Sequence, residues 1–346
     1  MTKRIITAGM VLMLLLLSGC KSKNSDYEEP EKRIYVSALG FDRRGEEIKI
    51  TAETISIAEN TSSNDYGIKR YQGEGETVAS ALYDLKKDLV PTPDLSHCAA
   101  LVVDRDVTEM QFGEIAEFCF LEKEITQSVH LVVAESPENL LDRSKESGKP
   151  TGFRIAEFLY EDIDGVKSFK NATLMSVIND LETKEFFQLP YFEPRENECV
   201  HTGWQVYKGG TAKYFLRRQE MQILEMVKNN FSNGEVSLPA SSGAQTFDLK
   251  RVESKIQWDS ASGGRLYVSV TAKTNSQKGD LKEREKAVSG EINNLISSLR
   301  RENIDLLNIK EKIRSAYPNL KSGGVDELFK SAPLEVKCSI KKGERR

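Results

Sequence analysis

The sequence predicts an α+β protein of three mixed α/β domains, each a small sheet with packed helices, behind an N-terminal tether. The length of 346 residues suits two or three domains. Hydrophobic residues make up 39% and charged residues 29%, with 23 Gly and 10 Pro, the balance of a soluble globular protein. Strand-like and helix-like patterns alternate along the chain. This composition excludes a chain disordered throughout, a collagen and a polytopic membrane protein.

The charge pattern gives no sign of nucleic-acid binding. The chain has 53 acidic and 49 basic residues and lacks a long Lys/Arg run, so it has no basic footprint for a polyanion. Five cysteines in a chain of this length are too few for a disulfide scaffold.

The N-terminus has the pattern of a signal peptide, predicted at residues 1–19. Lys3 and Arg4 precede a run of 13 uncharged residues, 5–17, which is shorter than the roughly 20 apolar residues that span a bilayer. The run ends in Leu17, Ser18, Gly19 and Cys20, which resembles the bacterial lipobox, whose Cys thiol accepts diacylglycerol before cleavage. The alternative is an ordinary signal peptide, or an uncleaved anchor, with a Cys at its edge.

A covalent lipid on Cys20 would hold the mature protein on the outer face of a membrane, since two or three acyl chains bind stably. Removing residues 1–19 takes away two bases and no acid, which leaves 47 minus 53, or −6. No basic patch adds to the membrane attraction, so the lipid would act alone. Residues 20–32 are the lipidated Cys and a polar tether with Pro30. No other cofactor is expected.

Residues 33–150 form the first predicted domain, in the order β-β-α-β-α-β-α. In residues 48–53, apolar and polar side chains alternate, which predicts a strand with one buried face. A polar loop is expected at 59–72, and Gly148-Lys149-Pro150 marks the boundary. The other predicted strands are 34–39, 98–103 and 129–134, and the predicted helices are 77–89, 112–121 and 138–145.

Residues 151–240 form a smaller predicted domain with helices at 152–162 and 172–182. A hairpin is expected from 203–207 and 212–216, with the glycines 209–210 in its turn.

Residues 241–346 form a predicted α+β unit of antiparallel type, in the order β-β-α-α-β. Its strands are 247–258, 265–274 and 334–340. Apolar residues at helical spacing predict one helix through 288–299 and a second through 306–316, which Pro318 ends.

The glycines at 73 and 75 are the first two of a dinucleotide fingerprint, but Val78 stands where the third glycine belongs. A buried strand does not precede them, and acidic residues flank the position of a pyrophosphate. The residues therefore predict a turn, with Thr77 as a helix cap.

The histidines, His97, His130 and His201, do not belong to any common catalytic motif. Cys199 and His201 would share one face of a strand, but a second ligand pair is missing, so we expect no metal site. Cys98 and Cys119 are either a disulfide or buried free thiols. The chain is therefore predicted not to be an enzyme.

Several short motifs occur along most of the chain. They are the lipobox, Ala38-Leu39-Gly40-Phe41-Asp42, Gly73-Glu74-Gly75-Glu76-Thr77 with Ala81-Leu82, Ser96-His97-Cys98, Arg314-Ser315-Ala316-Tyr317-Pro318, and the last strand, 336–342. Their order and spacing resemble the Ger(x)C family, the C subunits of spore germinant receptors. Two features depart from the family pattern: Lys21-Ser22 follows Cys20 in place of a tryptophan, and tryptophans are missing after Pro318.

The resemblance implies a three-domain, membrane-tethered, non-enzymatic subunit. It implies integral-membrane A and B subunits as partners, at the spore inner membrane, in nutrient-triggered germination. A partner surface would need aromatic anchors, and Tyr191, Phe192, Trp204 and Tyr207 are the candidates. The alternative is that these four fill the core of a small domain.

Two other functions compete with this interpretation. A substrate-binding lipoprotein of an envelope transport system needs a deep cleft between two similar α/β lobes. An envelope hydrolase needs clustered carboxylates or a nucleophile–base pair.

Overall fold

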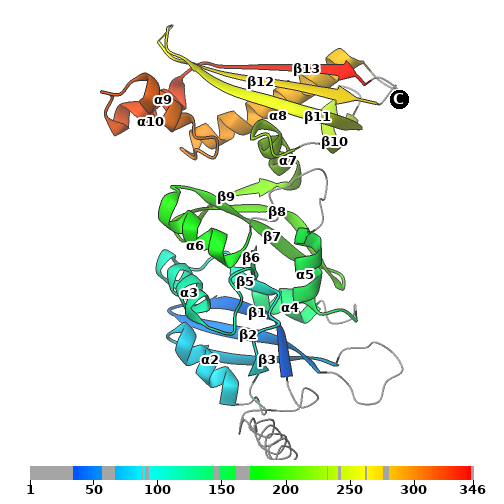
Figure 1. Cartoon of the computed structure of the whole chain (residues 1–346), viewed down its shortest axis with the longest axis vertical. Helices are drawn as coiled ribbons and strands as arrows, with labels where there is room; N and C mark the ends of the chain where they lie inside the picture. The colour runs from blue at the N-terminus through cyan, green and yellow to red at the C-terminus, as the bar shows by residue number, and fades with distance from the viewer. Residues whose placement is uncertain are drawn as a thin grey trace, which may run out of the picture. The chain divides into compact units, whose positions relative to one another are not determined.

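Two sheets and the helices packed on them make up the computed structural model (Figure 1). The structure describes residues 34–56, 67–87, 89, 93–143, 148–160, 172–231, 233–240, 243–261, 263–275 and 280–343. The α+β class is confirmed. No helix of this described part is long and apolar enough to cross a bilayer.

The first sheet has nine strands in the order β3-β2-β1-β5-β6-β7-β8-β9, with the short β4 beside the start of β1. Strands β1, β5, β6 and β7 run parallel to one another. At one end of the sheet β2 and β3, and at the other end β8 and β9, each pair antiparallel with the preceding strand along the sheet. The strands are β1 (Ile34–Arg44), β2 (Glu47–Ser56), β3 (Gly67–Gly75), β4 (Pro93–Asp94), β5 (Ala100–Asp104), β6 (His130–Ala134), β7 (Phe187–Arg195), β8 (Glu198–Lys208) and β9 (Thr211–Arg217).

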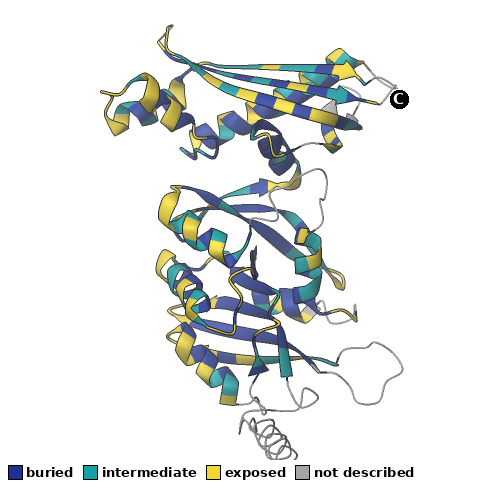
Figure 2. Cartoon of the chain, viewed as in Figure 1, coloured by how far each residue is buried: buried dark blue, intermediate teal, exposed yellow. Residues whose placement is uncertain are grey.

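Helices cover both faces of this sheet, as Figure 1 shows. One layer consists of α2 (Val78–Lys87), α3 (Glu109–Leu121) and α6 (Leu174–Thr183), and the other of α4 (Pro137–Arg143) and α5 (Thr151–Tyr160). The central strands β5 and β6 are therefore buried along their whole length, as their continuous apolar sequences predict (Figure 2).

The first sheet continues past the domain boundary predicted at residue 150. Val133 of β6 pairs with Tyr191 of β7, and β8 and β9 extend the sheet from there. The described residues thus form two sheets where the sequence predicts three separate units, because the hairpin of residues 198–217 joins an existing sheet instead of forming its own. This hairpin was predicted, and the strands pair through Val206 and Tyr214.

The second sheet has the order β10-β11-β12-β13. Its last pair, β12 and β13, is parallel, which differs from the predicted antiparallel type, because three helices cross over between the two strands. The elements are β10 (Asn233–Ala240), β11 (Gly243–Asp259), β12 (Arg265–Thr274), α8 (Leu281–Arg301), α9 (Ile309–Ala316), α10 (Ser322–Ser331) and β13 (Leu334–Lys342).

Helix α8 packs on this sheet through the predicted apolar stripe, since Val288, Ile292, Leu295 and Leu299 are all buried. Between the two sheets in sequence lies α7 (Arg218–Val227), which was not predicted and whose residues from Met221 on are all buried. This helix contacts β8 and β9 as well as β10, β11 and α8. Strand β10 and helix α10 were not predicted either, and β3 lies partly in the expected loop.

Candidate functional site

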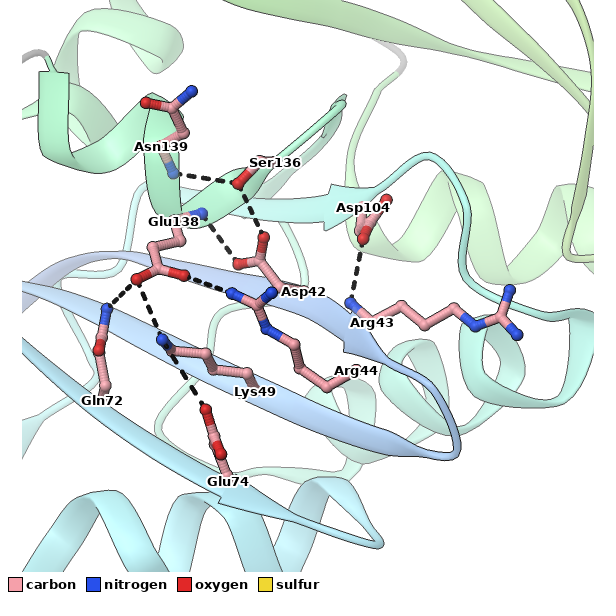
Figure 3. A network of polar contacts seen from close by, with 10 residues as sticks. All are labelled: Asp42, Arg43, Arg44, Lys49, Gln72, Glu74, Asp104, Ser136, Glu138 and Asn139. Atoms are coloured by element: carbon pink, nitrogen blue, oxygen red, sulfur yellow. Dashed lines mark hydrogen bonds and ion pairs between the residues drawn. The ribbon is translucent and has the colours of Figure 1, made fainter.

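A network of charged and polar side chains lies where the parallel strands β1, β5 and β6 end (Figure 3). Parallel neighbouring strands bring their carboxyl ends to the same sheet edge, where α/β proteins commonly place functional groups. Asp42 comes from the end of β1, Asp104 from the end of β5, and Ser136 from the turn after β6.

Asp42 accepts two hydrogen bonds from the start of α4. Its Oδ1 atom accepts from Ser136 Oγ at 3.1 Å, and its Oδ2 atom accepts from the backbone N–H of Glu138 at 2.9 Å. Burial raises the pKa of Asp42 to about 6, although these two hydrogen bonds favour its charged form. Asp42 therefore joins the first sheet to a helix N-terminus, where a carboxylate is also favoured by the helix dipole.

Asp104 joins β5 to β1 in a similar way. Its Oδ2 atom accepts from the backbone N–H of Arg43 at 3.0 Å, and its Oδ1 atom accepts from the N–H of Asp106 at 2.8 Å. Burial raises the pKa of Asp104 above its ordinary value.

Glu138 connects α4 to three strands. Its carboxylate accepts from Arg44 Nη2 at 2.8 Å, Lys49 Nζ at 3.0 Å and Gln72 Nε2 at 2.8 Å. The pKa of Glu138 lies below its ordinary value. Partial burial acts to raise this pKa, but the hydrogen bonds from Lys49 and Gln72 have the larger combined effect. Glu74 adds a second carboxylate 3.8 Å from Lys49 Nζ.

These carboxylates accept hydrogen bonds from backbone N–H groups, neutral side chains and cations, so the network holds the strands and the helix together. Groups of three or more His, Cys, Asp or Glu side chains that could bind a metal do not occur among the residues described. The hydrogen bonds and ion pairs therefore fix the geometry of the sheet edge.

A second, more deeply buried network surrounds Glu53 of β2. Its side chain is 0% exposed, and it accepts hydrogen bonds from Ser37 Oγ at 2.7 Å and Thr151 Oγ1 at 2.8 Å. The backbone N–H of Gly152 and the Arg70 guanidinium, both within 3.3 Å, complete it. Glu53 was expected on a solvated strand face, but α5 covers that face.

A cavity of about 1610 Å³ lies between the start of β7, the end of α7, the second half of β11 and α9. Glu225 of α7, which is fully buried, accepts from Asn230 Nδ2 at 2.8 Å and from Gln188 Nε2 at 3.3 Å. Several cations at the cavity are paired: Lys228 with Glu225, and Lys310 with Glu185 at 4.0 Å and with Asp326 at 2.8 Å.

The four aromatic residues considered as a partner surface lie in the interior. Tyr191 and Tyr207 pack in the core beneath α2, α3 and α6, and Phe192 and Trp204 pack in the core that continues to the second sheet. All four are at most 3% exposed. They therefore occupy core positions, as the alternative interpretation describes, because β7 and β8 lie between β6 and β9 in a sheet that is covered on both faces.

The histidines lie in three separate places. His97 is exposed beside Tyr35, His130 is buried at the start of β6, and His201 is buried between Phe158 and Phe192. Burial lowers the pKa of His130, and it lowers the pKa of His201 to about 3. None of them joins the network around Asp42.

The four described cysteines are free thiols, so the disulfide considered between Cys98 and Cys119 is not formed. Both are buried, and burial raises the pKa of Cys98 to about 12, which keeps its thiol protonated and unreactive. The lipobox residues Leu17, Ser18, Gly19 and Cys20 lie outside the described residues.

Comparisons with known proteins identify the family of this chain. The family model "Spore germination protein N-terminal domain" matches residues 26–194, and "Spore germination B3/GerAC like, C-terminal" matches residues 202–341. The chain belongs to the Ger(x)C spore germination family. A solved structure, the crystal structure of the GerBC protein, is similar in fold, with 16% sequence identity and a TM-score of 0.52 over 92% of this chain and 100% of that chain. No curated protein matches.

In this Ger(x)C protein, two of the motifs that carry the resemblance make close contacts in the first sheet. Asp42 ends the Ala38–Asp42 motif and binds α4. Gly73 and Gly75 lie against the backbone of α2, where a Cβ atom on Gly73 would come 2.3 Å from the Leu85 nitrogen and one on Gly75 would come 2.6 Å from the Ala81 nitrogen. Glu53, Asp104 and Glu138 were not singled out from the sequence, although Glu138 is the first residue of the helix predicted at 138–145.

Proposed function

We propose that this chain is the lipid-anchored, non-enzymatic C subunit of a spore germinant receptor. In this role it acts with integral-membrane A and B subunits at the spore inner membrane in nutrient-triggered germination. The observation that carries the proposal is the succession of the two spore germination regions, at residues 26–194 and 202–341, directly after the lipobox at Cys20.

The role of the lipid follows from the free energy that its acyl chains gain in a bilayer. Each buried CH₂ contributes about 0.8 kcal/mol, so two or three acyl chains hold a protein stably without help from charge. The mature chain, at −6, would be repelled by anionic headgroups. Lipidation of Cys20 is therefore the step on which membrane attachment depends.

A Cys20→Ala variant tests the anchor. We expect it to leave the membrane fraction and to reduce the rate of nutrient-triggered germination. The Ser22→Ala variant, two residues away, should stay in the membrane fraction and leave the germination rate unchanged. Membrane retention of Cys20→Ala equal to that of the unaltered chain would refute the anchor.

Deletion of the whole chain tests the receptor role. We expect normal spore formation and slow or absent germination with nutrients, and normal germination with an agent that bypasses receptors. Unchanged nutrient germination would refute this role. Purification through a C-terminal tag separates the alternative function, since a transport permease in place of multi-span receptor subunits would favour the substrate-binding lipoprotein.

A further inference from the structure

Strand β11 pairs with a different neighbour along each half of its length, and in the described part of the chain only Lys250 is paired on both sides. Residues 243–250 pair with β10, whereas residues 253–259 pair with β12 alone among the described strands. A bulge between Lys250 and Glu253 separates the two halves, and Arg251 lies there with φ of 51°. Because β10 begins at Asn233, opposite Lys250, the position beside the second half of β11 has no described strand.

Hydrogen bonds at two places show which backbone groups face that position. The Asn229 side chain donates from Nδ2 to Ser254 O at 2.9 Å and accepts from Ser254 N at 2.6 Å, as a neighbouring strand would. On the far side of β12, the N–H of Leu266 donates to Pro333 O at 2.9 Å, so the opposed pair of Trp258 and Leu266 is not hydrogen-bonded. Both observations indicate that every second residue of β11 directs its backbone N–H and C=O groups away from β12.

It follows that Lys255 and Gln257 direct their backbone groups to β12, and that Ile256 and Trp258 direct theirs away from it. The unpaired stretch is bounded by side chains, since Asn229 covers Ser254 and Tyr317 Oη donates to Ser260 O at 3.3 Å. Between these bounds, no hydrogen bond from the described residues reaches the outward N–H and C=O groups of Ile256 and Trp258.

The cavity of about 1610 Å³ borders this stretch, and Ile256, Gln257 and Trp258 line it. Pockets for small molecules are commonly about 300–1,000 Å³, so this space suits a chain segment better than a metabolite. Lys312 and Arg314 of α9 line the same cavity, are exposed, and form no ion pair with any residue that the structure describes. These two bases would attract carboxylates, and one exposed acid of the same helix, Glu311, also lines the cavity.

We propose that the second half of β11 is a strand-addition site, which binds an extended, acidic segment of a partner protein through the backbone of Ile256 and Trp258. Strand addition supplies affinity through main-chain hydrogen bonds, and the side chains beside the edge supply preference. Here that preference comes from Lys312 and Arg314. This proposal is independent of the receptor role and of the anchor.

The test uses the full-length chain in detergent and a mixture of eight-residue peptides with Val, Ile or Thr alternating with Glu or Asp. On binding, we expect amide exchange at Ile256 and Trp258 to slow at least about tenfold, with no change at Lys255 and Gln257. The same peptides N-methylated at alternate residues should lose binding, because they cannot donate to the edge. Lys312→Ala with Arg314→Ala should weaken binding about tenfold, and Lys255→Ala should leave it unchanged.

Ile256→Pro provides a test within the chain, since it removes an outward N–H and no bond to β12. We expect the fold to be retained and peptide binding to be lost. If this variant does not fold, the N-methylated peptides decide the question with the unaltered chain. Failure of the mixture to bind at about 1 mM, equal binding of N-methylated peptides, or protection elsewhere than Ile256 and Trp258 would each overturn the proposal.

Discussion

The Thr151 hydroxyl donates a 2.8 Å hydrogen bond to Glu53 Oε2 across 98 residues of sequence, joining β2 to the start of α5. The same carboxylate accepts from the N–H of Gly152 and faces the Arg70 guanidinium. Because the carboxylate is fully buried, these partners replace the water that it loses.

Glu53→Ala should therefore lower the free energy of unfolding by about 3–5 kcal/mol, since it leaves the Arg70 guanidinium buried without its counter-charge. Urea denaturation measures this difference. Glu117→Ala, on the exposed side of α3, is the control and should change stability by less than about 0.5 kcal/mol. A loss at Glu53 no larger than that of the control would contradict the assigned network.

Asp42 should make the fold less stable as pH rises from about 4 to about 6. Burial raises its pKa from 3.8 to about 6, so the folded state holds its proton more tightly than the unfolded state. The stabilisation is complete below pH 4 and is lost as pH rises through 6, by at most about 3 kcal/mol. Urea midpoints at several pH values for the unaltered chain and Asp42→Asn measure it. Identical pH profiles would contradict the raised pKa.

His201 should act in the opposite direction over an overlapping range. Burial, helped by the nearby charge of Arg218, lowers its pKa from 6.5 to about 3, so the unfolded state binds the proton more tightly. Stability from this group rises with pH from about 3 to about 6.5. His201→Gln should flatten that part of the profile, whereas His97→Gln, at an exposed site, should not. If stability rises with pH as steeply in His201→Gln as in the unaltered chain, the imidazole of His201 is not buried.

Gly73→Ala should destabilise the protein by at least about 1–3 kcal/mol. Its Cβ would meet the backbone of α2 at 2.3–2.7 Å, and a helix backbone cannot move aside locally. Gly290→Ala is the matched control, because that glycine lies in α8 with open space around it, and it should stabilise by about 0.5–1 kcal/mol. Thermal unfolding of both variants distinguishes them. Equal effects would mean that α2 lies farther from β3.

Local patterns in the sequence predict most of the regular elements but not how they combine. The apolar stripe of α8 and the strands β5, β6 and β12 follow from periodicity, because one covered face or two leave a distinct pattern. Helix α7 does not follow, because Gln222 and Glu225 are buried in it and mask the apolar stripe.

The candidate site was less predictable for a related reason. Asp42 was noticed only in a turn sequence between two predicted strands and in a family motif. Glu53 was expected in water because Lys49, Thr51 and Glu53 alternate with apolar neighbours. All three are buried beneath α4 and α5. These helices supply polar partners to Lys49 and Glu53, whereas the Thr51 hydroxyl has no hydrogen-bond partner among the described residues. Alternation in the sequence shows which residues of a strand are polar. Only the tertiary fold shows whether a polar side chain is buried and which hydrogen-bond partners it then has.

The meeting point of the two family regions has a practical consequence. One region ends at residue 194 and the next begins at 202, yet Pro194 pairs with Cys199 in the hairpin that joins β7 to β8. A gene split at that point would divide a hairpin and strip the outer strands from β7, leaving a bare, apolar edge prone to self-association. Recombination that exchanges halves between homologous subunits should therefore succeed only with a crossover beyond Arg217, where the sheet is complete.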